Sequence, residues 1–349
     1  MARGYDIKFV IRTAGQRPDK WYDTHQYAAW RYSGFLKGLQ GKKVGFIQFE
    51  DIMNHLQEGK DIPVFEFDIS GKCFKKTDQK GIDAQVVATE VFESVPVSFA
   101  EKSRQMSQVK EFYRHQKEKG SVQTYINSLD SLKSQDKYWL LDVQRNSPQT
   151  PMAPSFFFSS KKDLEEFLKT EKKEYILKAR LGMAGVGTGK LTEESLESIT
   201  DENIQSHVIQ EEVKNIICEL RVVYGPHTEH LGTRAFFQRR APWEKRATSQ
   251  KKHTAMEYEL SDYEKEISRQ IISYAGVEVG SADWLISVPE STPIKENISS
   301  QELAAIIHEQ GQYYFAEING FGTNFGPLVS PYDLNETVAR KISQKYLQD

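Results

Sequence analysis

The residues with the clearest chemical potential lie in residues 175–191 (YILKARLGMAGVGTGKL). Lys178 precedes a turn in which glycine recurs every two or three positions, and this turn includes Gly185 and Gly187. Glycine lets backbone N–H groups approach phosphate oxygens because it has no Cβ to obstruct them. A lysine on the adjoining strand adds a point charge for the same phosphates. The segment predicts a phosphate-binding turn; the alternative is an ordinary glycine-rich hairpin.

The same turn has a superficial similarity to a P-loop, the motif GxxxxGK[ST]. Residues 184–191 (AGVGTGKL) depart from this motif at both ends. Ala184 replaces the first glycine, and Leu191 replaces the hydroxyl residue that binds magnesium. The lysine and the glycines are therefore interpreted as a phosphate site of another kind.

A second group of residues offers oxygen atoms to a metal ion. Residues 314–326 (YFAEINGFGTNFG) contain Glu317 and Asn319, which share one face of a strand because side chains alternate with a period of two. Asp283 stands in an otherwise apolar strand, where a charge needs a partner. Two carboxylates and an amide are the hard ligands that magnesium prefers. Taken singly, each acid is more often a salt-bridged structural residue.

A third signal lies between two apolar stretches, at residues 208–224 (VIQEEVKNIICELRVVY). The link through Glu211, Glu212 and Val213 can offer backbone N–H and C=O groups to an adenine ring. Glu219 can accept ribose hydroxyls, and Arg221, on the same strand face, can meet a phosphate or a reacting carboxylate. The alternative for Glu219 and Arg221 is a structural charge pair.

Hydrophobic periodicity predicts the elements that hold these residues. Strands are expected at 6–12, 43–49, 63–69, 174–179, 207–213, 218–224, 230–238, 278–286 and 313–319. Helices are expected at 25–39, 99–119, 159–168, 263–274 and 336–347, with a further one beginning at Asp136-Lys137 and one capped by Thr192.

Composition limits the class of protein. A chain of 349 residues can form two or three domains. Its net charge of −3, from 46 basic and 49 acidic residues, argues against a dedicated nucleic-acid binder. Charged residues near the start exclude the apolar core of a signal peptide, and no apolar run reaches the ~20 residues that span a bilayer. We therefore expect a soluble, cytoplasmic protein without membrane or nucleic-acid partners.

Cysteines and aromatic residues add little that is specific. Cys73 and Cys218 are expected to be reduced, buried thiols rather than a disulfide. An aromatic group between Trp21 and Tyr32 has two interpretations, a recognition surface or the core-facing side of a helix, and the second is favoured.

The order of these motifs resembles that of the ATP-grasp superfamily, and most of all its ribosomal-protein glutamate ligases and bacterial glutathione synthetases. The resemblance covers residues 130–349 and runs from Asp136-Lys137 to Glu317-x-Asn319. It implies an α+β fold in which two subdomains clasp ATP behind an N-terminal α/β domain. The expected division is 1–127, 128–209 and 210–349.

The resemblance also implies roles for the residues. Lys137 and Lys178, with the glycine turn, would hold the ATP phosphates, and Glu211 and Val213 would contact adenine through their backbone. Further residues would bind ribose (Glu219), Mg²⁺ or Mn²⁺ (Asp283, Glu317 and Asn319), and the transferred phosphate or acyl phosphate (Arg221 with Arg239 or Arg240).

Two features depart from the family pattern. Residues 287–312 form a longer and more polar connection than the family needs, so a surface excursion is expected there. The final motif, 320–324 (GFGTN), replaces the commoner small-residue-Pro-Gly. The basic stretch 245–253 is either a lid over an anionic substrate or a solvated loop.

The expected activity is that of an ATP-dependent ligase, which activates a carboxylate as an acyl phosphate and joins it to an amine of an amino acid or peptide. One alternative is a phosphotransferase on the same scaffold, with a hydroxyl as acceptor. Another is a non-catalytic ATP-binding protein. The family resemblance makes a homodimer a reasonable expectation.

Overall fold

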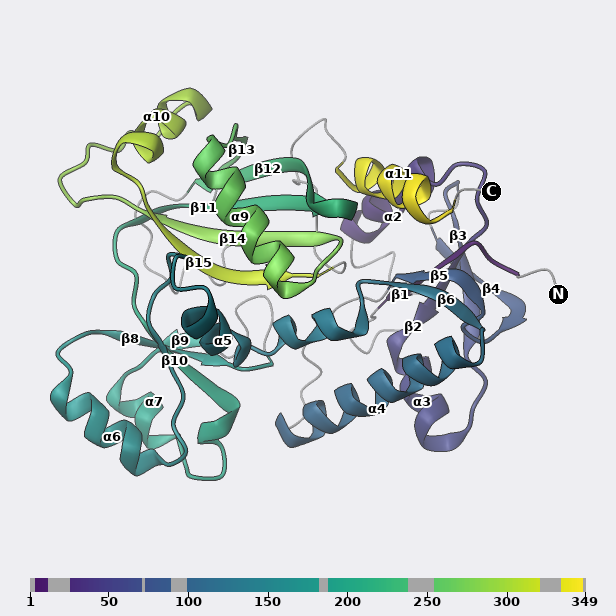
Figure 1. Ribbon diagram of the computed structural model, residues 1–349, viewed down its shortest axis with the longest axis horizontal. Helices are drawn as coiled ribbons and strands as arrows, with labels where there is room; N and C mark the ends of the chain where they lie inside the picture. Colours follow the sequence, from purple (N-terminus) through teal and green to yellow (C-terminus); the bar gives the residue numbers. More distant parts are fainter. Residues whose placement is uncertain are drawn as a thin grey trace.

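Three β-sheets organise the chain, and each is built from one stretch of the sequence (Figure 1). The structure is a computed structural model that describes residues 4–11, 26–70, 73–88, 99–181, 188–237, 254–320 and 334–347. It confirms the mixed α and β class that the sequence predicts.

The first sheet has the strand order β4-β3-β2-β1-β5-β6. The strands β2, β1, β5 and β6 are parallel to one another. β3 pairs antiparallel with β2 on one side and with β4 on the other. Helices cover both faces, so β1 is buried throughout. The elements are β1 (Ile7–Ile11), α2 (Gln26–Gly38), β2 (Val44–Gln48), α3 (Phe49–Glu58), β3 (Pro63–Asp68), β4 (Cys73–Lys80), β5 (Ala84–Ala88), α4 (Phe99–Glu118) and β6 (Val122–Ile126).

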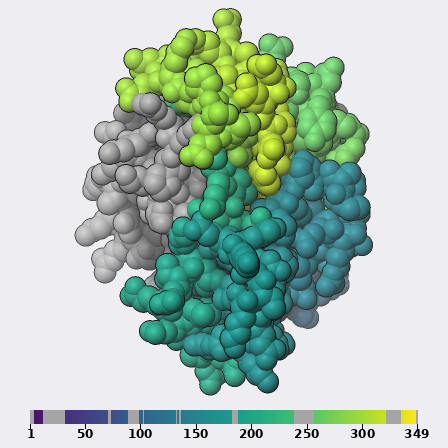
Figure 2. All heavy atoms as spheres, turned by 90° about the vertical axis from the view of Figure 1, so that its left-hand side faces the viewer, coloured from purple at the N-terminus to yellow at the C-terminus, as the bar shows by residue number. Residues whose placement is uncertain are grey.

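The second sheet is antiparallel, with the order β7-β10-β8-β9. It packs on α6 around a small apolar cluster of its own, which includes Leu164, Tyr175 and Ile209. Ser160 and Thr192 cap its two α-helices through their hydroxyl groups. The elements are β7 (Ser155–Phe156), α6 (Lys161–Thr170), β8 (Tyr175–Ala179), β9 (Thr188–Lys190), α7 (Glu193–Glu197), η3 (Ile204–Ser206) and β10 (His207–Glu211). In Figure 2 this teal unit lies at the bottom, opposite the yellow-green α10 region.

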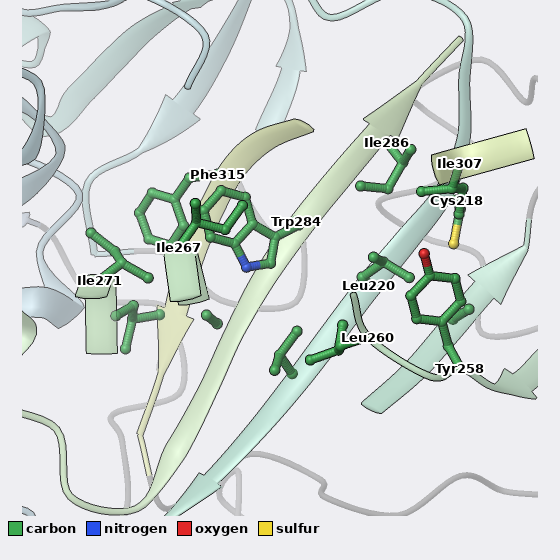
Figure 3. Packing of buried hydrophobic residues seen from close by; sticks show 14 of the residues in the cluster. Cys218, Leu220, Tyr258, Leu260, Ile267, Ile271, Trp284, Ile286, Ile307 and Phe315 are labelled. Carbon is green, nitrogen blue, oxygen red and sulfur yellow. The ribbon is translucent and has the colours of Figure 1, made fainter. Parts of the chain in front are cut away.

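The third sheet is also antiparallel, with the order β13-β12-β11-β14-β15. One face carries the largest apolar cluster, in which Trp284 and Phe315 meet edge to face at 5.5 Å between ring centroids (Figure 3). The elements are β11 (Ile216–Gly225), η4 (Pro226–Thr228), β12 (Glu229–Phe237), β13 (Thr254–Glu257), α9 (Asp262–Ala275), β14 (Gly280–Ser287), α10 (Ser300–Gln310) and β15 (Gln312–Asn319). Two elements before the second sheet, η2 (Leu129–Gln135) and α5 (Trp139–Asn146), come earlier in the chain. The helix α5 buries Trp139, Leu140 and Val143 in the apolar cluster of the third sheet.

The first and third sheets share an interface. The last helix, α11 (Leu334–Tyr346), packs on α2, and a Cβ added to Gly38 would lie 2.3 Å from the Glu336 carbonyl oxygen. Asn127 donates to the Val279 carbonyl at 2.7 Å and accepts from the Val279 N–H at 2.7 Å. One apolar cluster therefore includes residues of both sheets.

The expected helices and strands are confirmed in the described ranges to within a few residues. The sequence analysis missed α3 and the strands β4, β5, β6, β7, β9 and β13. It was wrong about residues 287–312, because α10 buries Leu303 and Ile307 in the core of the third sheet. Tyr32 is a core residue, whereas Trp21 lies outside the described residues. Cys73 and Cys218 are free thiols; Cys218 is buried and Cys73 is only partly so.

None of the helices in the described ranges has the length and apolar character needed to cross a bilayer.

Candidate active site

Asp283 lies at the centre of a row of charged residues that crosses the third sheet. Strand register places it opposite Arg221 on β11 and opposite Glu317 on β15. Residues directly opposite in an antiparallel pair share a face of the sheet. This face is the one that does not carry Leu220, Trp284 and Phe315 of the apolar core.

The Asp283 carboxylate is enclosed by hydrogen-bond donors. It is 2% exposed and accepts two hydrogen bonds from Arg221, at 3.0 Å from Nε and 2.6 Å from Nη2. Asn319 Nδ2 and Ser281 Oγ donate to it at 2.8 and 3.2 Å. Burial raises the pKa of the Asp283 carboxyl, and the Arg221 guanidinium opposes that rise. Asp283 therefore has the partner that its apolar surroundings require.

The three predicted metal ligands come together on this face. The structure places Asp283 opposite Glu317, and Asn319 contacts Asp283, as the period-two pattern predicts. Two carboxylates and an amide oxygen fit the ligand chemistry of Mg²⁺. Among the described residues, no group of three or more His, Cys, Asp or Glu side chains is arranged to hold a metal.

Lys137 brings a positive charge to the same place. Burial lowers the pKa of its ammonium group, while the negative charges of Glu317 and Asp136 act against that change. Its backbone N–H donates to the Arg180 carbonyl at 3.0 Å, next to the end of β8. Lys137 therefore connects the third sheet to the second.

Lys178 is the predicted phosphate lysine on β8. It is 9% exposed, and its register partners are Val208 on β10 and Thr188 on β9. It stands two residues before Arg180, whose carbonyl holds Lys137. The segments that carry the two lysines are thus joined through the Arg180 carbonyl.

An Arg180–Asp136 ion pair is a part of the site that the sequence analysis did not identify. The guanidinium donates to both carboxylate oxygens, at 3.0 Å from Nε and 2.6 Å from Nη2. It also lies over the rings of Phe99 and Tyr138, at 4.6 and 4.9 Å from their centroids. The pair fixes the backbone that carries Lys137. The two partners are 44 positions apart in the sequence, so no local pattern reveals the pair.

The linker from β10 to β11 has a fixed backbone. The Glu211 N–H donates to the Pro154 carbonyl at 2.9 Å, and the Glu212 N–H donates to the Glu174 carbonyl at 2.8 Å. In the described part of the chain, no backbone hydrogen bond engages the Val213 N–H. A cavity of about 620 Å³ lies against this linker. The linker can therefore present backbone groups to a planar ligand.

Glu219 and Arg221 meet each other on β11. Glu219 Oε1 lies 3.5 Å from Arg221 Nη2, and the Glu219 side chain is 28% exposed. The contact agrees with the charge-pair interpretation of these two residues.

Comparison with solved structures identifies the fold. No protein-family model matches the chain, and no curated protein sequence matches it. The macrocyclase MdnC bound with precursor peptide MdnA, from Microcystis aeruginosa MRC, aligns with a TM-score of 0.59 and 14% identity over 97% of this chain and 100% of that one. The ATP-grasp ligase PsnB, complexed with a phosphomimetic variant of minimal precursor, Mg and ADP, aligns with a TM-score of 0.55 and 15% identity. The alignment covers 93% of this chain and 92% of that one. D-alanyl-alanine synthetase A from Vibrio cholerae O1 aligns with a TM-score of 0.56 and 12% identity over 99% of this chain and 100% of that one.

The chain has the ATP-grasp fold.

Several predicted residues of the ATP-grasp site lie outside the described residues. They are Gly185 and Gly187 of the glycine turn, Arg239, Arg240 and the basic stretch 245–253. Their roles stay predictions. The described part of the candidate site consists of the charged row of the third sheet, the linker, and the two lysines near the end of β8.

Proposed function

We propose that this chain is an ATP-dependent carboxylate–amine ligase. It would phosphorylate the carboxylate of an amino acid or peptide and pass the resulting acyl group to an amine. The observation that carries the proposal is the meeting of Lys137, Arg221, Asp283, Glu317 and Asn319 beside one sheet face. Two cations next to a carboxylate–amide set are suited to a charged triphosphate that arrives with a metal ion.

The proposed nucleotide site follows the linker. The Val213 N–H and the linker carbonyls would contact adenine, and Glu219 would accept the ribose hydroxyls. Lys137, Lys178 and the turn with Gly185 and Gly187 would hold the phosphates. The bound ADP of the PsnB structure supports this assignment, because PsnB has the same fold.

Asp283, Glu317 and Asn319 would hold Mg²⁺ in this proposal. The ion, when bound, supplies charge neutralisation to the phosphates and orients them. The chain's own residues add to this effect. Arg221 is held rigidly by Asp283, so its charge is oriented before substrate arrives and requires no reorganisation during the reaction.

The chemical logic is activation of a poor leaving group. A carboxylate oxygen leaves too poorly for an amine to displace it. Phosphorylation converts the carboxylate into an acyl phosphate, a mixed anhydride from which the attacking amine displaces phosphate readily. Transfer of the phosphoryl group is in line and depends on positioning and charge. Arg221, with Arg239 or Arg240, would neutralise the charge of the acyl phosphate and of the tetrahedral oxyanion.

Peptides are proposed as one class of substrate. Support comes from the MdnC and PsnB structures, which were solved with precursor peptides. The D-alanyl-alanine synthetase structure supports single amino acids as the other class. We also propose the domain limits 1–127, 128–209 and 210–349. The separate strand sets of the three sheets support a division into three parts, and the second limit falls inside β10 (His207–Glu211).

A phosphate-release screen tests the proposal. Purified protein is incubated with ATP, Mg²⁺ and paired amino acids and peptides, and products are identified by mass spectrometry. A ligase releases ADP and phosphate only when an acid and an amine are both present, and an amide product appears. A stable phosphoester would instead identify a phosphotransferase. ATP binding without turnover over the whole set would identify a non-catalytic protein.

A further inference from the structure

Arg234 on β12 is a buried cation outside the set described above. Its residue is 5% exposed, and its Nη1 donates only to the carbonyl of the neighbouring Thr233, at 3.1 Å. Its Nε and Nη2 are buried and have no hydrogen-bond partner in the described part of the chain. The carboxylate of Glu257 is 4.0 Å from Nη1 and belongs to a side chain that is 56% exposed.

Arg234 belongs to the same transverse row as the proposed metal ligands. It is the register partner of Arg221 on one side and of Glu257 on the other. Its side chain therefore lies on the face of the sheet that carries Arg221, Asp283 and Glu317. Neighbouring strands are about 4.8 Å apart, so Arg234 lies one strand spacing beyond Arg221, on the side away from Asp283.

Two arginines directly opposite each other repel and destabilise a sheet unless anions neutralise both. Arg221 has such partners in Asp283 and Glu219. Burial lowers the pKa of Arg234, and Glu257 only partly opposes this, yet a guanidinium stays protonated in proteins. A buried charge with unmet donors costs free energy, so Arg234 needs an anion from elsewhere.

We propose that Arg234 binds a second anionic group of the acid substrate, a carboxylate or a phosphate, about one strand spacing (~5 Å) from the carboxylate that is activated beside Arg221. This inference rests on the proposed ligase function and names its substrate class. The acid is a dianion, such as a dicarboxylate, rather than a monocarboxylic acid. Arg221 already uses its Nε and Nη2 to hold Asp283.

Binding of three small acids tests the subsite. Succinate, 3-phosphonopropionate and butyrate are of similar length, but butyrate lacks the second anion. Their Kd values are measured by calorimetry with the full chain, with and without ADP and Mg²⁺. We expect at least one dianion to bind the wild type about 10- to 100-fold more tightly than butyrate, from typical charge-assisted hydrogen bonds. Which dianion binds better distinguishes a carboxylate from a phosphate.

Variants assign the preference to this side chain. Arg234→Gln should remove the preference and leave butyrate binding unchanged, whereas Arg269→Gln, an exposed arginine on α9, should keep the wild-type preference. Equal binding of all three acids to the wild type would overturn the proposal. So would equal weakening of dianions and butyrate in Arg234→Gln, or failure of both dianions to bind at about 50 mM, a level far above useful affinity.

The melting temperature separates ligand binding from a structural role. Arg234→Met removes the unmet donors but keeps apolar bulk, so the ligand-free variant should melt at the wild-type temperature or above it. A fall of several degrees would identify a structural arginine and overturn the proposal. If no acid and amine pair yields ADP but dianions bind through Arg234, the ligase proposal fails and the subsite stands. If ligase activity is found without Arg234-dependent preference, only the subsite fails.

Discussion

At the scale of single residues, the site depends on charges that are buried together. Asp283 is almost fully buried, and Arg221 binds it through two hydrogen bonds. The pair fixes the position of both side chains before any ligand arrives. It also means that neither residue can be changed without leaving the other charge poorly compensated.

Asp283→Ala should lower the free energy of unfolding by about 2–3 kcal/mol, because the Arg221 guanidinium then lacks its main anionic partner. The double variant Asp283→Ala, Arg221→Met should recover part of this loss. Urea denaturation without nucleotide measures both effects. A double variant that is less stable than the single one would show that the pair contributes net stability.

Glu317→Gln should reduce the rate of ADP release by about 100- to 1,000-fold, as is typical when one electrostatic group of an active site is lost. The fold should be unaffected, because Glu317 is partly exposed on β15. Glu309→Gln, an exposed position on α10, is the matched control. Unaltered turnover in Glu317→Gln would remove it from the proposed metal set.

Lys8 predicts a pH dependence of stability. It is 1% exposed on β1, and burial lowers its pKa to about 8. In the unfolded chain it keeps its proton up to about pH 10.5. Since the unfolded state binds more protons between these values, stability should rise with pH there. Above pH 10.5, the loss of this proton has raised the free energy of unfolding by about 3 kcal/mol relative to its value below pH 8.

Lys8→Met isolates this contribution. Chemical denaturation of wild type and variant is measured between pH 7 and about pH 10. The free energy of unfolding of the wild type should rise relative to that of the variant as the pH rises. A difference that is constant over this range would mean that the buried ammonium keeps an ordinary pKa.

At the scale of elements, the spacing of β14 and β15 positions the proposed ligands. A Cβ added to Gly280 would lie 2.3 Å from the Asn319 carbonyl oxygen, closer than any real contact. The two strands can approach only because this residue is glycine. The position of Asn319 therefore depends on a residue that makes no contact with ligand itself.

Gly280→Ala should destabilise the protein by about 1–3 kcal/mol and weaken binding of Mg²⁺ with ADP, because β15 must shift. Gly276→Ala is the control. Its φ of +68° is strained for alanine, but its Cβ would meet nothing within 4 Å. It should cost about 1 kcal/mol and leave ligand binding unchanged. Chemical denaturation and calorimetry measure the two effects, and equal binding by both variants would contradict the argument.

At the scale of the whole molecule, the three sheets differ in how firmly they are held. The first and third share an apolar cluster and the Asn127 hydrogen bonds. The second sheet has a small cluster of its own, with five fully buried members. Fewer buried contacts imply a lower free energy of local opening.

Amides of β8 and β10 should therefore exchange with solvent faster than those of β11 and β14. Hydrogen exchange followed by mass spectrometry measures this difference. Addition of ADP and Mg²⁺ should slow exchange in the second sheet more than in the first, since the proposed ligand contacts the second directly. Equal protection of the second and third sheets without ligand would contradict the inference from core size.

Local sequence patterns determined more of the fold than of the site. The helix that begins after Thr192 and the shared face of Glu317 and Asn319 both follow from rules that act within a few residues. The strand β4 was missed because it is an exposed edge strand of mostly polar residues, which has no apolar alternation to reveal it. Helix α10 was misjudged because Leu303 is buried against residues that are distant in the sequence, in the apolar cluster of the third sheet.

By itself, the sequence determined the order of the candidate motifs, most of the elements that carry them, and the residue types that are proposed to bind phosphate and metal. Only the tertiary structure decided which charges meet: Arg221 with Asp283, Arg180 with Asp136, and Arg234 without a carboxylate close enough to hydrogen-bond among the described residues. The reason is strand register. A slip of one residue would move every side chain to the opposite face, and register is fixed by packing between distant segments rather than by local pattern.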